Sequence, residues 1–293
     1  MKRIIAALLS ALLLLSFAGA EELSVSAGSG GIRGYSREAG YVYLTLGEYP
    51  QKADGTVLPI LWRVLAAAED RAYLLSEYIL FARTMHTSLK EYRDVLKGDF
   101  AQTELCHYLN GDFADQAFTD AEKGLLLEFE NFGKVFLVSR DDMKNKAYGL
   151  GSTNPGTTSL KKIEADPGVR AWGTEWAIHN NGFPEEEYPD PRARVIGRAG
   201  SHISQEEMRL YVFQARYGAC SPWWARTQST TDKRQAVCTK DGGQIGRIEV
   251  GRDNEGVRPA VYLDLKAVEI TGGAGTKENP YQIAPKAGEA ENR

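Results

Sequence analysis

The hydrophobic pattern at the start of the folded region is typical of β-strands. Aromatic, β-branched and leucine residues fill 41–47, and Pro50 follows them. Two similar apolar runs, 59–65 and 72–76, flank a polar turn at 69–71. Such runs on either side of a short polar turn predict a β-hairpin. The region therefore begins with strands.

The middle of the chain changes to a helical period. An apolar stripe at i, i+3 and i+4 predicts a helix over 103–109, which Asn110 and Gly111 are expected to end. Thr119 and Glu122 have the spacing of a capping box, in which each side chain satisfies the backbone N–H of the other residue. We therefore predict a second helix after Thr119.

Further short elements follow. Residues 135–138 predict a buried strand, and 139–142 predict another helix start. The C-terminal third returns to strand-like runs, at 209–213, 223–227, 235–239, 244–250 and 257–265. Strands followed by helices and then strands indicate one α+β domain of antiparallel strands with a few helices.

We place this domain at 41–266. The Ser/Gly-rich residues 21–40 predict a flexible leader, and 267–293 predict a turn-and-strand tail with a polar C-terminus. Residues 147–203 are irregular. The acidic residues at 185–187 and 190 within them allow either a calcium site or a solvated loop, and we favour the loop.

The first twenty residues have the pattern of a secretory signal peptide. Lys2 and Arg3 precede the apolar run 4–15, and small residues lead to Ala20. A run of this length is too short to cross about 30 Å of hydrocarbon. We therefore expect cleavage after Ala20, a secreted or periplasmic location, and no stable membrane insertion after the signal is removed.

Composition excludes several classes of protein. The 293 residues are 25% charged and 43% hydrophobic, which is ordinary for a folded domain and excludes global disorder. The net charge of −4 gives no electrostatic reason to expect a nucleic-acid partner.

Several short motifs, in one order, resemble a known family. They are Gly47–Gln51, Ile60–Leu65 with Leu74–Ser76, Tyr108–Phe113 with Ala117–Glu122, and Pro222–Arg226 with Gly256–Ala260. This pattern resembles the uncharacterised domain of unknown function 6273, found in secreted bacterial proteins. The paired tryptophans and the late arginine strand are more weakly similar to C-type-lectin-like domains, a fold that formylglycine-generating enzymes also use. The family has no established activity, so the resemblance implies a fold and not a reaction.

Trp223, Trp224 and Arg226 are the candidate ligand-binding residues. Neighbours in a strand point to opposite faces, so the two indoles cannot form one flat platform without a bulge. One interpretation leaves Trp224 near a rim, where it stacks on a sugar or peptide. The other, which we favour, buries both indoles in the core.

The two arginines Arg226 and Arg258 each lie among apolar neighbours. A buried guanidinium needs acceptors, and Asp264 shares a strand face with Arg258, so Asp264 is its predicted partner. The alternative is that such an arginine binds an anionic ligand. We favour a structural role for Arg226, Arg258 and Asp264, and also for Trp62 within its apolar motif.

The three cysteines suggest two kinds of chemistry. In an oxidising compartment, Cys220 and Cys238 can form a disulfide across the tryptophan hairpin. Cys106 would then remain free. Its neighbour His107 points about 100° away on a helix and is not placed to activate the thiol.

These residues favour a binding function over catalysis. We expect an exported, non-catalytic binding or surface-interaction module whose partner is an unknown surface glycan or protein. The chain contains no common hydrolase, zinc or nucleotide motif, so we predict no catalytic residue, metal or cofactor. The alternative is an extracytoplasmic enzyme, a hydrolase or thiol enzyme that uses paired carboxylates or Cys106.

Overall fold

The computed structural model describes residues 31–152, 162, 165–179, 221–240, 243–253 and 255–286. Several predicted features lie outside these residues: the signal peptide, Cys220, the acidic residues at 185–190 and the strand at 209–213. Among the described residues, no helix is long and apolar enough to cross a membrane.

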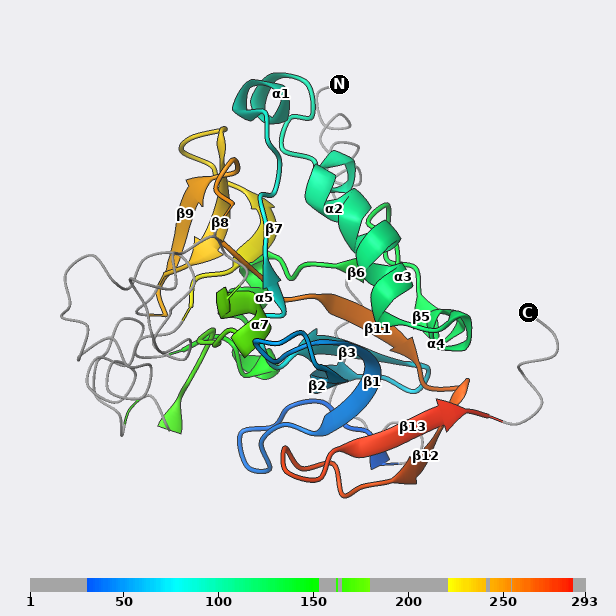
Figure 1. Ribbon diagram of the computed structural model, residues 1–293. Coiled ribbons are helices and arrows are strands. Elements are labelled where there is room, and N and C mark those ends of the chain that lie inside the picture. The colour runs from blue at the N-terminus through cyan, green and yellow to red at the C-terminus, as the bar shows by residue number, and fades with distance from the viewer. Residues whose placement is uncertain are drawn as a thin grey trace, which may run out of the picture.

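The largest unit is a mixed β-sheet of eight strands within the described residues (Figure 1). Across the sheet, the order is β12 (Val268–Gly272), β13 (Tyr281–Pro285), β1 (Tyr43–Pro50), β2 (Val57–Ala67), β3 (Arg71–Ser76), β11 (Ala260–Asp264) and β5 (Leu126–Leu127), and β6 (Val135–Phe136) also pairs with β11. The pairs in this sheet are antiparallel, except that β1 and β13 run parallel. The predicted hairpin is confirmed as β2 and β3.

Two smaller sheets and several short helices complete the described fold. The sheets pair β4 (Phe81–Ala82) with β10 (Gly256–Val257), and join β7 (Trp224–Gln228), β8 (Gln235–Thr239) and β9 (Ile245–Glu249). The helices are α1 (Leu89–Asp94), η2 (Phe100–Gln102), α2 (Glu104–Tyr108), η3 (Leu109–Phe113), α3 (Ala114–Ala117), α4 (Asp120–Gly124), α5 (Arg140–Lys144), η4 (Lys146–Tyr148) and α7 (Glu175–His179). The predicted α+β class is therefore confirmed.

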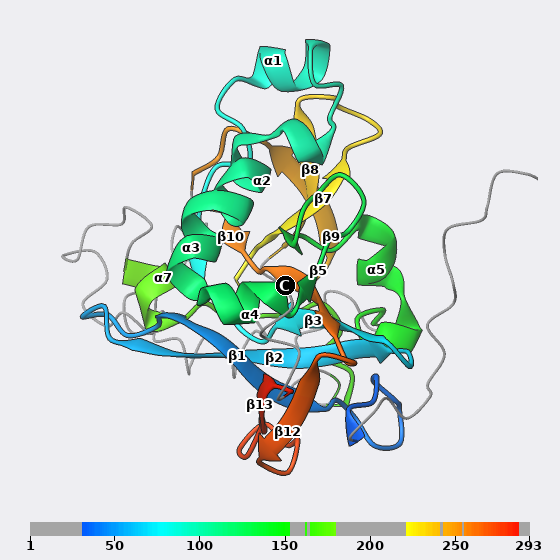
Figure 2. The ribbon, with the colours of Figure 1, turned by 90° about the vertical axis from the view of Figure 1, so that its right-hand side faces the viewer.

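The helices α2, α3 and α4 cover one face of the main sheet, and the β12–β13 hairpin lies on the other side of β1 and β2 (Figure 2). Trp62 explains this packing, because it is fully buried and its ring stacks on Phe118. Its indole Nε1 donates to the carbonyl of Leu46 at 2.8 Å, which satisfies the one polar atom of the side chain. Trp62 therefore lies in the core, which is consistent with the structural role expected for it.

Short-range capping fixes where two of these helices begin. Thr119 and Glu122 form the predicted capping box before α4. Ser139 and Asp142 form a second capping box before α5. Both starts were predictable because each box involves residues only three positions apart.

The predicted helix end at Asn110 and Gly111 is present as a kink, after which a new helix begins without an intervening loop. The chain bends at Gly111, where φ is −109° and ψ is −106°, and continues as α3. Asn110 stabilises the bend, because its side chain accepts from the Val135 N–H and donates to the Cys106 carbonyl. A distant strand therefore supplies the hydrogen bonds that a helix end would have needed.

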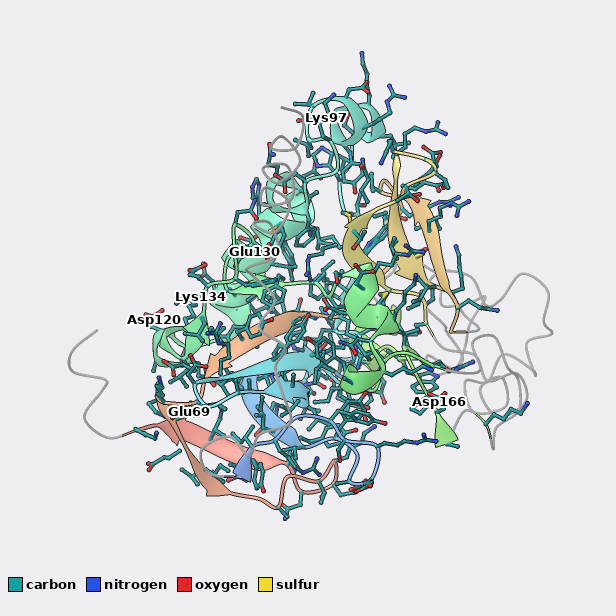
Figure 3. All side chains as sticks on the ribbon, turned by 180° about the vertical axis from the view of Figure 1, so that it is seen from behind. Glu69, Lys97, Asp120, Glu130, Lys134 and Asp166 are labelled. Carbon is teal, nitrogen blue, oxygen red and sulfur yellow. The ribbon has the colours of Figure 1, made fainter. Side chains whose placement is uncertain are left out.

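Both ends of the described chain pack against this sheet. Although a flexible leader was predicted over 21–40, Ile32 is fully buried, and Arg33 donates to the carbonyls of Ala39 and Gly40. Near the other end, the β12–β13 hairpin extends the sheet beyond β1. Charged side chains such as Glu69, Lys97 and Asp120 project into solvent from the outer surface (Figure 3).

Candidate functional site

Four charged side chains meet on the sheet face opposite to Trp62, and we call them the arginine cluster: Arg63, Glu77, Arg258 and Lys277. Arg63 follows Trp62 on β2, and neighbouring strand residues point to opposite faces. Glu77 directly follows β3, Arg258 lies between β10 and β11, and Lys277 lies in the β12–β13 turn. Arg258 has no exposed surface, and Arg63 exposes only 6%.

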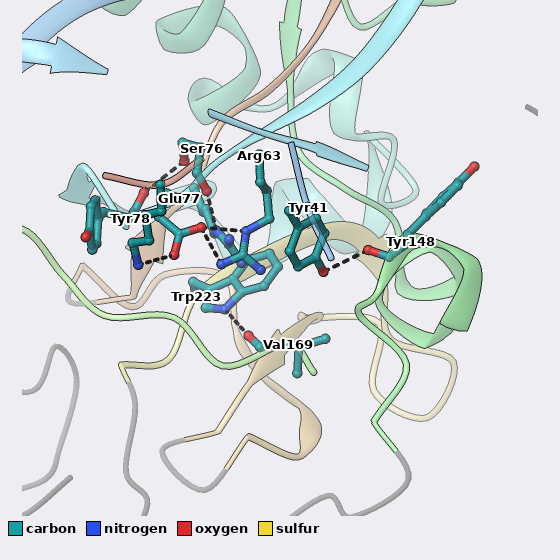
Figure 4. Close-up of polar contacts among 10 residues, drawn as sticks. Tyr41, Arg63, Ser76, Glu77, Tyr78, Tyr148, Val169 and Trp223 are labelled. Carbon is teal, nitrogen blue, oxygen red and sulfur yellow. Dashed lines mark hydrogen bonds and ion pairs between the residues drawn. The ribbon is translucent and has the colours of Figure 1, made fainter. Parts of the chain in front are cut away.

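Glu77 is held by two cations. Arg63 donates through Nε to Glu77 Oε2 at 2.6 Å, and its NH2 group forms an ion pair with the same oxygen (Figure 4). Lys277 Nζ donates to Glu77 Oε1 at 2.8 Å. Burial opposes ionisation of Glu77, but Arg63, Arg258 and Lys277 together outweigh it and lower the pKa. Glu77 is therefore a carboxylate at neutral pH.

Arg258 has hydrogen-bond partners for fewer of its polar atoms than Glu77 does. Its Nε donates to the carbonyl of Ser76 at 2.6 Å, and its guanidinium lies over the Trp223 ring at 5.2 Å. Its NH1 and NH2 groups are buried without a hydrogen-bond partner among the described residues, as is NH1 of Arg63. Burial, and then the positive charge of Arg63, lower the pKa of Arg258 to about 9. The side chain is thus still charged at neutral pH, with donors left over.

Backbone packing brings Arg258 over Trp223. The Gly256 N–H donates to the carbonyl of Pro222 at 3.0 Å, which joins the two segments one residue before Trp223. A Cβ atom at Gly256 would lie 2.7 Å from both that carbonyl oxygen and Ile79 Cγ2, so only glycine fits. The close approach at Gly256 thereby fixes where Arg258 lies, two residues later.

Asp264 was wrongly predicted as the partner of Arg258. Pro259 separates Arg258 from β11, and six residues of extended chain span about 20 Å. Asp264 instead lies opposite Arg71 on β3, and its Oδ1 accepts from the Lys266 N–H at 2.9 Å. Its role is structural, as predicted, but it serves a turn at the end of the sheet.

Both tryptophans are fully buried. Trp223 donates from Nε1 to the Val169 carbonyl at 3.0 Å, and Trp224 donates to the Arg83 carbonyl at 2.9 Å. The two indoles thus enter different surroundings, as expected for strand neighbours. Trp224 has no exposed face for a ligand to stack on, which corrects the rim interpretation. Trp223 contributes its ring face to the arginine cluster.

Arg226 has protein partners and is not a free binding group. Its NH1 donates to the Leu137 carbonyl at 2.6 Å and to Asp142 Oδ2 at 3.3 Å. The Tyr73 hydroxyl donates to the same carboxylate oxygen at 3.2 Å. The guanidinium also lies over two phenylalanine rings, at 5.3 Å each. We call Tyr73, Asp142 and Arg226 the Asp142 network. The ligand-binding role predicted for Arg226 is corrected to a structural one.

The thiols do not have the surroundings of nucleophiles. Cys106 exposes 3% of its surface, and burial, with a smaller effect of Asp99, raises its pKa to about 12. Burial likewise raises the pKa of Cys238 to about 12. Both thiols are free in the structure. Cys220 lies outside the described residues, so the disulfide between Cys220 and Cys238 stays a prediction.

Carboxylates line a groove between β1 and the α3–α4 connection. They belong to Glu48, Asp115 and Glu122. Glu122 accepts from the Gly47 N–H at 3.0 Å, and Asp115 accepts from Lys123 at 2.6 Å. Two of the three acids are therefore engaged in holding the fold together. Within the described ranges, no group of three or more histidine, cysteine or acidic side chains is arranged to hold a metal ion.

A family model for a domain of unknown function, DUF6273, matches residues 69–265, more than half of the chain. The chain belongs to this family. No curated protein and no solved structure shows significant similarity to it. Within the DUF6273 match lie Glu77, Trp223 and Arg258. Arg63 and Lys277 come from the flanking segments, so the complete cluster needs more of the chain than the DUF6273 domain.

Sequence reasoning missed three members of the arginine cluster: Arg63, Glu77 and Lys277. Arg63 gave a usable signal, because it interrupts an apolar strand whose alternate residues are buried on both sides. The same reasoning had selected Arg226 and Arg258. Glu77 gave the same signal, because it stands between the apolar residues of 74–75 and 78–81, whereas Lys277 gave none, because it lies in a polar, glycine-rich turn.

Proposed function

We propose that this protein is an exported, non-catalytic binding module that recognises an acidic group of its ligand through Arg258 and Arg63. The observation that supports this function is the set of three buried guanidinium nitrogens without a partner among the described residues. An arginine presents a planar array of donors that matches oxyanions. Export is proposed from the basic, apolar and small-residue pattern of residues 1–20.

The energetics of burial support a ligand at this position. A charged group that is removed from water without a compensating partner costs several kcal/mol. Hydrogen bonds between an arginine and an oxyanion are charge-assisted and are about twice as strong as neutral ones. A ligand that brings an acidic group to Arg258 therefore offsets a cost that the unliganded fold bears.

The chemistry of the cluster favours binding over catalysis. Its charged groups are two arginines, one lysine and a glutamate whose pKa is lowered by its ion pairs. None of these four exchanges a proton readily near neutral pH, which general acid–base catalysis requires. The enzyme alternative, with Cys106 as a nucleophile, is disfavoured by the raised pKa of that thiol.

A C-type-lectin-like fold, which we expect only from the paired tryptophans and the late arginine strand of the sequence, belongs to the same proposal. It is consistent with an exported module in a secreted or periplasmic location, and with a surface glycan or protein as partner. Fold alone does not specify a ligand, so the arginine cluster carries the functional part of the proposal.

Binding arrays test this function. Acidic glycans and acidic peptides, each beside a neutral counterpart, are probed with wild-type protein, Arg258→Lys and Arg226→Lys. We expect saturable binding to acidic members, weakened about tenfold or more by Arg258→Lys because lysine lacks the planar array of donors. Arg226→Lys, the same substitution at a partly buried arginine outside the cluster, should bind as the wild type does. Equal binding to neutral counterparts, or no binding to any member, would contradict the proposal.

A further inference from the structure

The geometry of the free donors narrows the chemistry of the acidic group. Arg258 uses Nε for the Ser76 carbonyl, so the buried NH1 and NH2 groups at its terminal edge have no hydrogen-bond partner among the described residues. Arg63 uses Nε and NH2 for Glu77, so it adds only NH1. The arginines thus offer two coplanar donors from one guanidinium and a third donor from its neighbour.

Aromatic rings restrict how an anion approaches these donors. The Arg258 guanidinium lies over the Trp223 ring, and the Arg63 guanidinium lies over the Tyr41 ring at 4.6 Å. The face of an aromatic ring carries partial negative charge and repels oxyanions. Oxygens therefore approach in the guanidinium plane. A carboxylate places both oxygens in one plane, whereas a phosphate or sulfate group directs oxygens out of it.

The net charge of the buried groups also favours a carboxylate over a phosphate group. Arg63 and Arg258 are positive and Glu77 is negative, which leaves one positive charge in the buried part of the cluster. Lys277 exposes 39% of its side chain, so solvent screens its charge. One carboxylate neutralises a single buried charge. A phosphate monoester, with about −1.5 to −2 at neutral pH, would leave excess negative charge out of water.

We infer that the ligand binds through a single carboxylate, which accepts hydrogen bonds from NH1 and NH2 of Arg258 and from NH1 of Arg63. This inference rests on the proposed function and specifies its ligand class. The carboxylate can belong to an acidic sugar or to a peptide, and both present the same planar group.

Thermal unfolding of the purified protein at pH 7 and constant ionic strength tests this assignment. Sodium chloride is replaced stepwise by sodium acetate, sulfate or phosphate. We expect acetate to raise the Tm of the wild type by about 3 °C over chloride. Arg258→Lys should lose this gain and Arg226→Lys should keep it, so general salt effects on stability are subtracted. Glucuronate and an N-acetylated dipeptide, each added at the same concentration, then distinguish the two sources.

A second variant keeps the test decisive if Arg258→Lys fails to fold. Glu77→Gln removes the buried negative charge, so we expect phosphate to raise its Tm more than acetate does. A larger gain with phosphate or sulfate in the wild type, lost in Arg258→Lys, would overturn the carboxylate assignment and leave the binding function standing, and so would the same preference for acetate in Glu77→Gln as in the wild type. The absence of any anion effect in the wild type beyond that in Arg258→Lys would overturn both.

Discussion

Arg226 and Arg258 both lie within family motifs, among apolar neighbours, yet their surroundings differ. Arg226, with 16% of its side chain exposed, donates to a carbonyl and to the Asp142 carboxylate. Arg258, with none exposed, donates to one carbonyl and keeps two donor groups without a described partner. The more deeply buried side chain therefore has fewer partners, and this difference is the basis of the ligand-binding role that we propose for Arg258.

The two regions are close together in the structure. The Tyr41 hydroxyl, beside the arginine cluster, donates to the Tyr148 carbonyl at 2.9 Å. The Tyr148 ring in turn meets Tyr73 of the Asp142 network edge-on, at 5.7 Å between ring centres. This proximity makes the regions suitable internal controls for each other.

Arg226→Met should produce the largest loss. It leaves Asp142 without its cation and the Leu137 carbonyl without a donor. Removing one partner of a buried pair typically costs 3–5 kcal/mol, and partial exposure reduces this to about 2–3 kcal/mol. Urea unfolding of both proteins measures the difference. A loss below about 1 kcal/mol would mean that the Asp142 network does not hold this region together.

Glu77→Gln should produce an intermediate loss that depends on pH. The pKa of Glu77 is lowered in the folded protein, so the carboxylate stabilises the fold above its ordinary value of 4.5. That contribution is lost as the pH falls below 4.5 toward the lowered pKa. We expect a deficit of about 1–2 kcal/mol at pH 7, which shrinks in acid.

Unfolding of wild type and Glu77→Gln from pH 7 to pH 3 measures this convergence. Asp142→Asn serves as the parallel variant in the other region. Stability curves of wild type and Glu77→Gln that stay parallel throughout would contradict an ionised, ion-paired Glu77.

Arg258→Met should cost little in a buffer without carboxylates. Methionine removes a buried charge that lacks full compensation, and replacing such charges by apolar groups is often neutral or stabilising. We expect a change within about 1 kcal/mol of wild type, well below that of Arg226→Met. Equal losses in the two variants, measured under the same denaturant conditions, would remove the distinction between the two arginines.

Lys277→Met should have the smallest effect. Its ammonium pairs with Glu77 but exposes 39% of the side chain, and exposed ion pairs contribute about 0–1 kcal/mol. We expect a loss near 0.5 kcal/mol at low salt that disappears at high salt. A loss larger than that of Glu77→Gln would show that Lys277, and not Arg63, is the main partner of the carboxylate.

The local elements were predictable from the sequence. The capping boxes at Thr119 and Ser139 and the β2–β3 hairpin depend on residues only a few positions apart. The direct continuation into α3 after the bend at Gly111 was missed because Asn110 bonds to Val135, which lies 25 residues away. Local sequence patterns therefore predict individual helices and hairpins. They do not predict a bend that is stabilised by hydrogen bonds from a distant segment.

The arginine cluster illustrates the same limit more strongly. The hydrogen bonds of this cluster join residues that are far apart in the sequence. Arg258 bonds to Ser76 across a separation of 182 positions, and Lys277 bonds to Glu77 across 200. A charged residue in an apolar run marked Arg258 as buried and in need of partners. Only the fold shows that Asp264 lies too far from Arg258 to pair with it. The fold also shows that Arg63 is a charged neighbour of Arg258.

A crystal structure with and without acetate tests the central claim most directly. With acetate, we predict planar density within about 3 Å of NH1 and NH2 of Arg258 and of NH1 of Arg63. Without acetate, that density should be absent while both arginines keep their positions. An acidic side chain of the protein itself, paired with the terminal edge of Arg258 in both crystals, would contradict the claim that this arginine awaits a ligand.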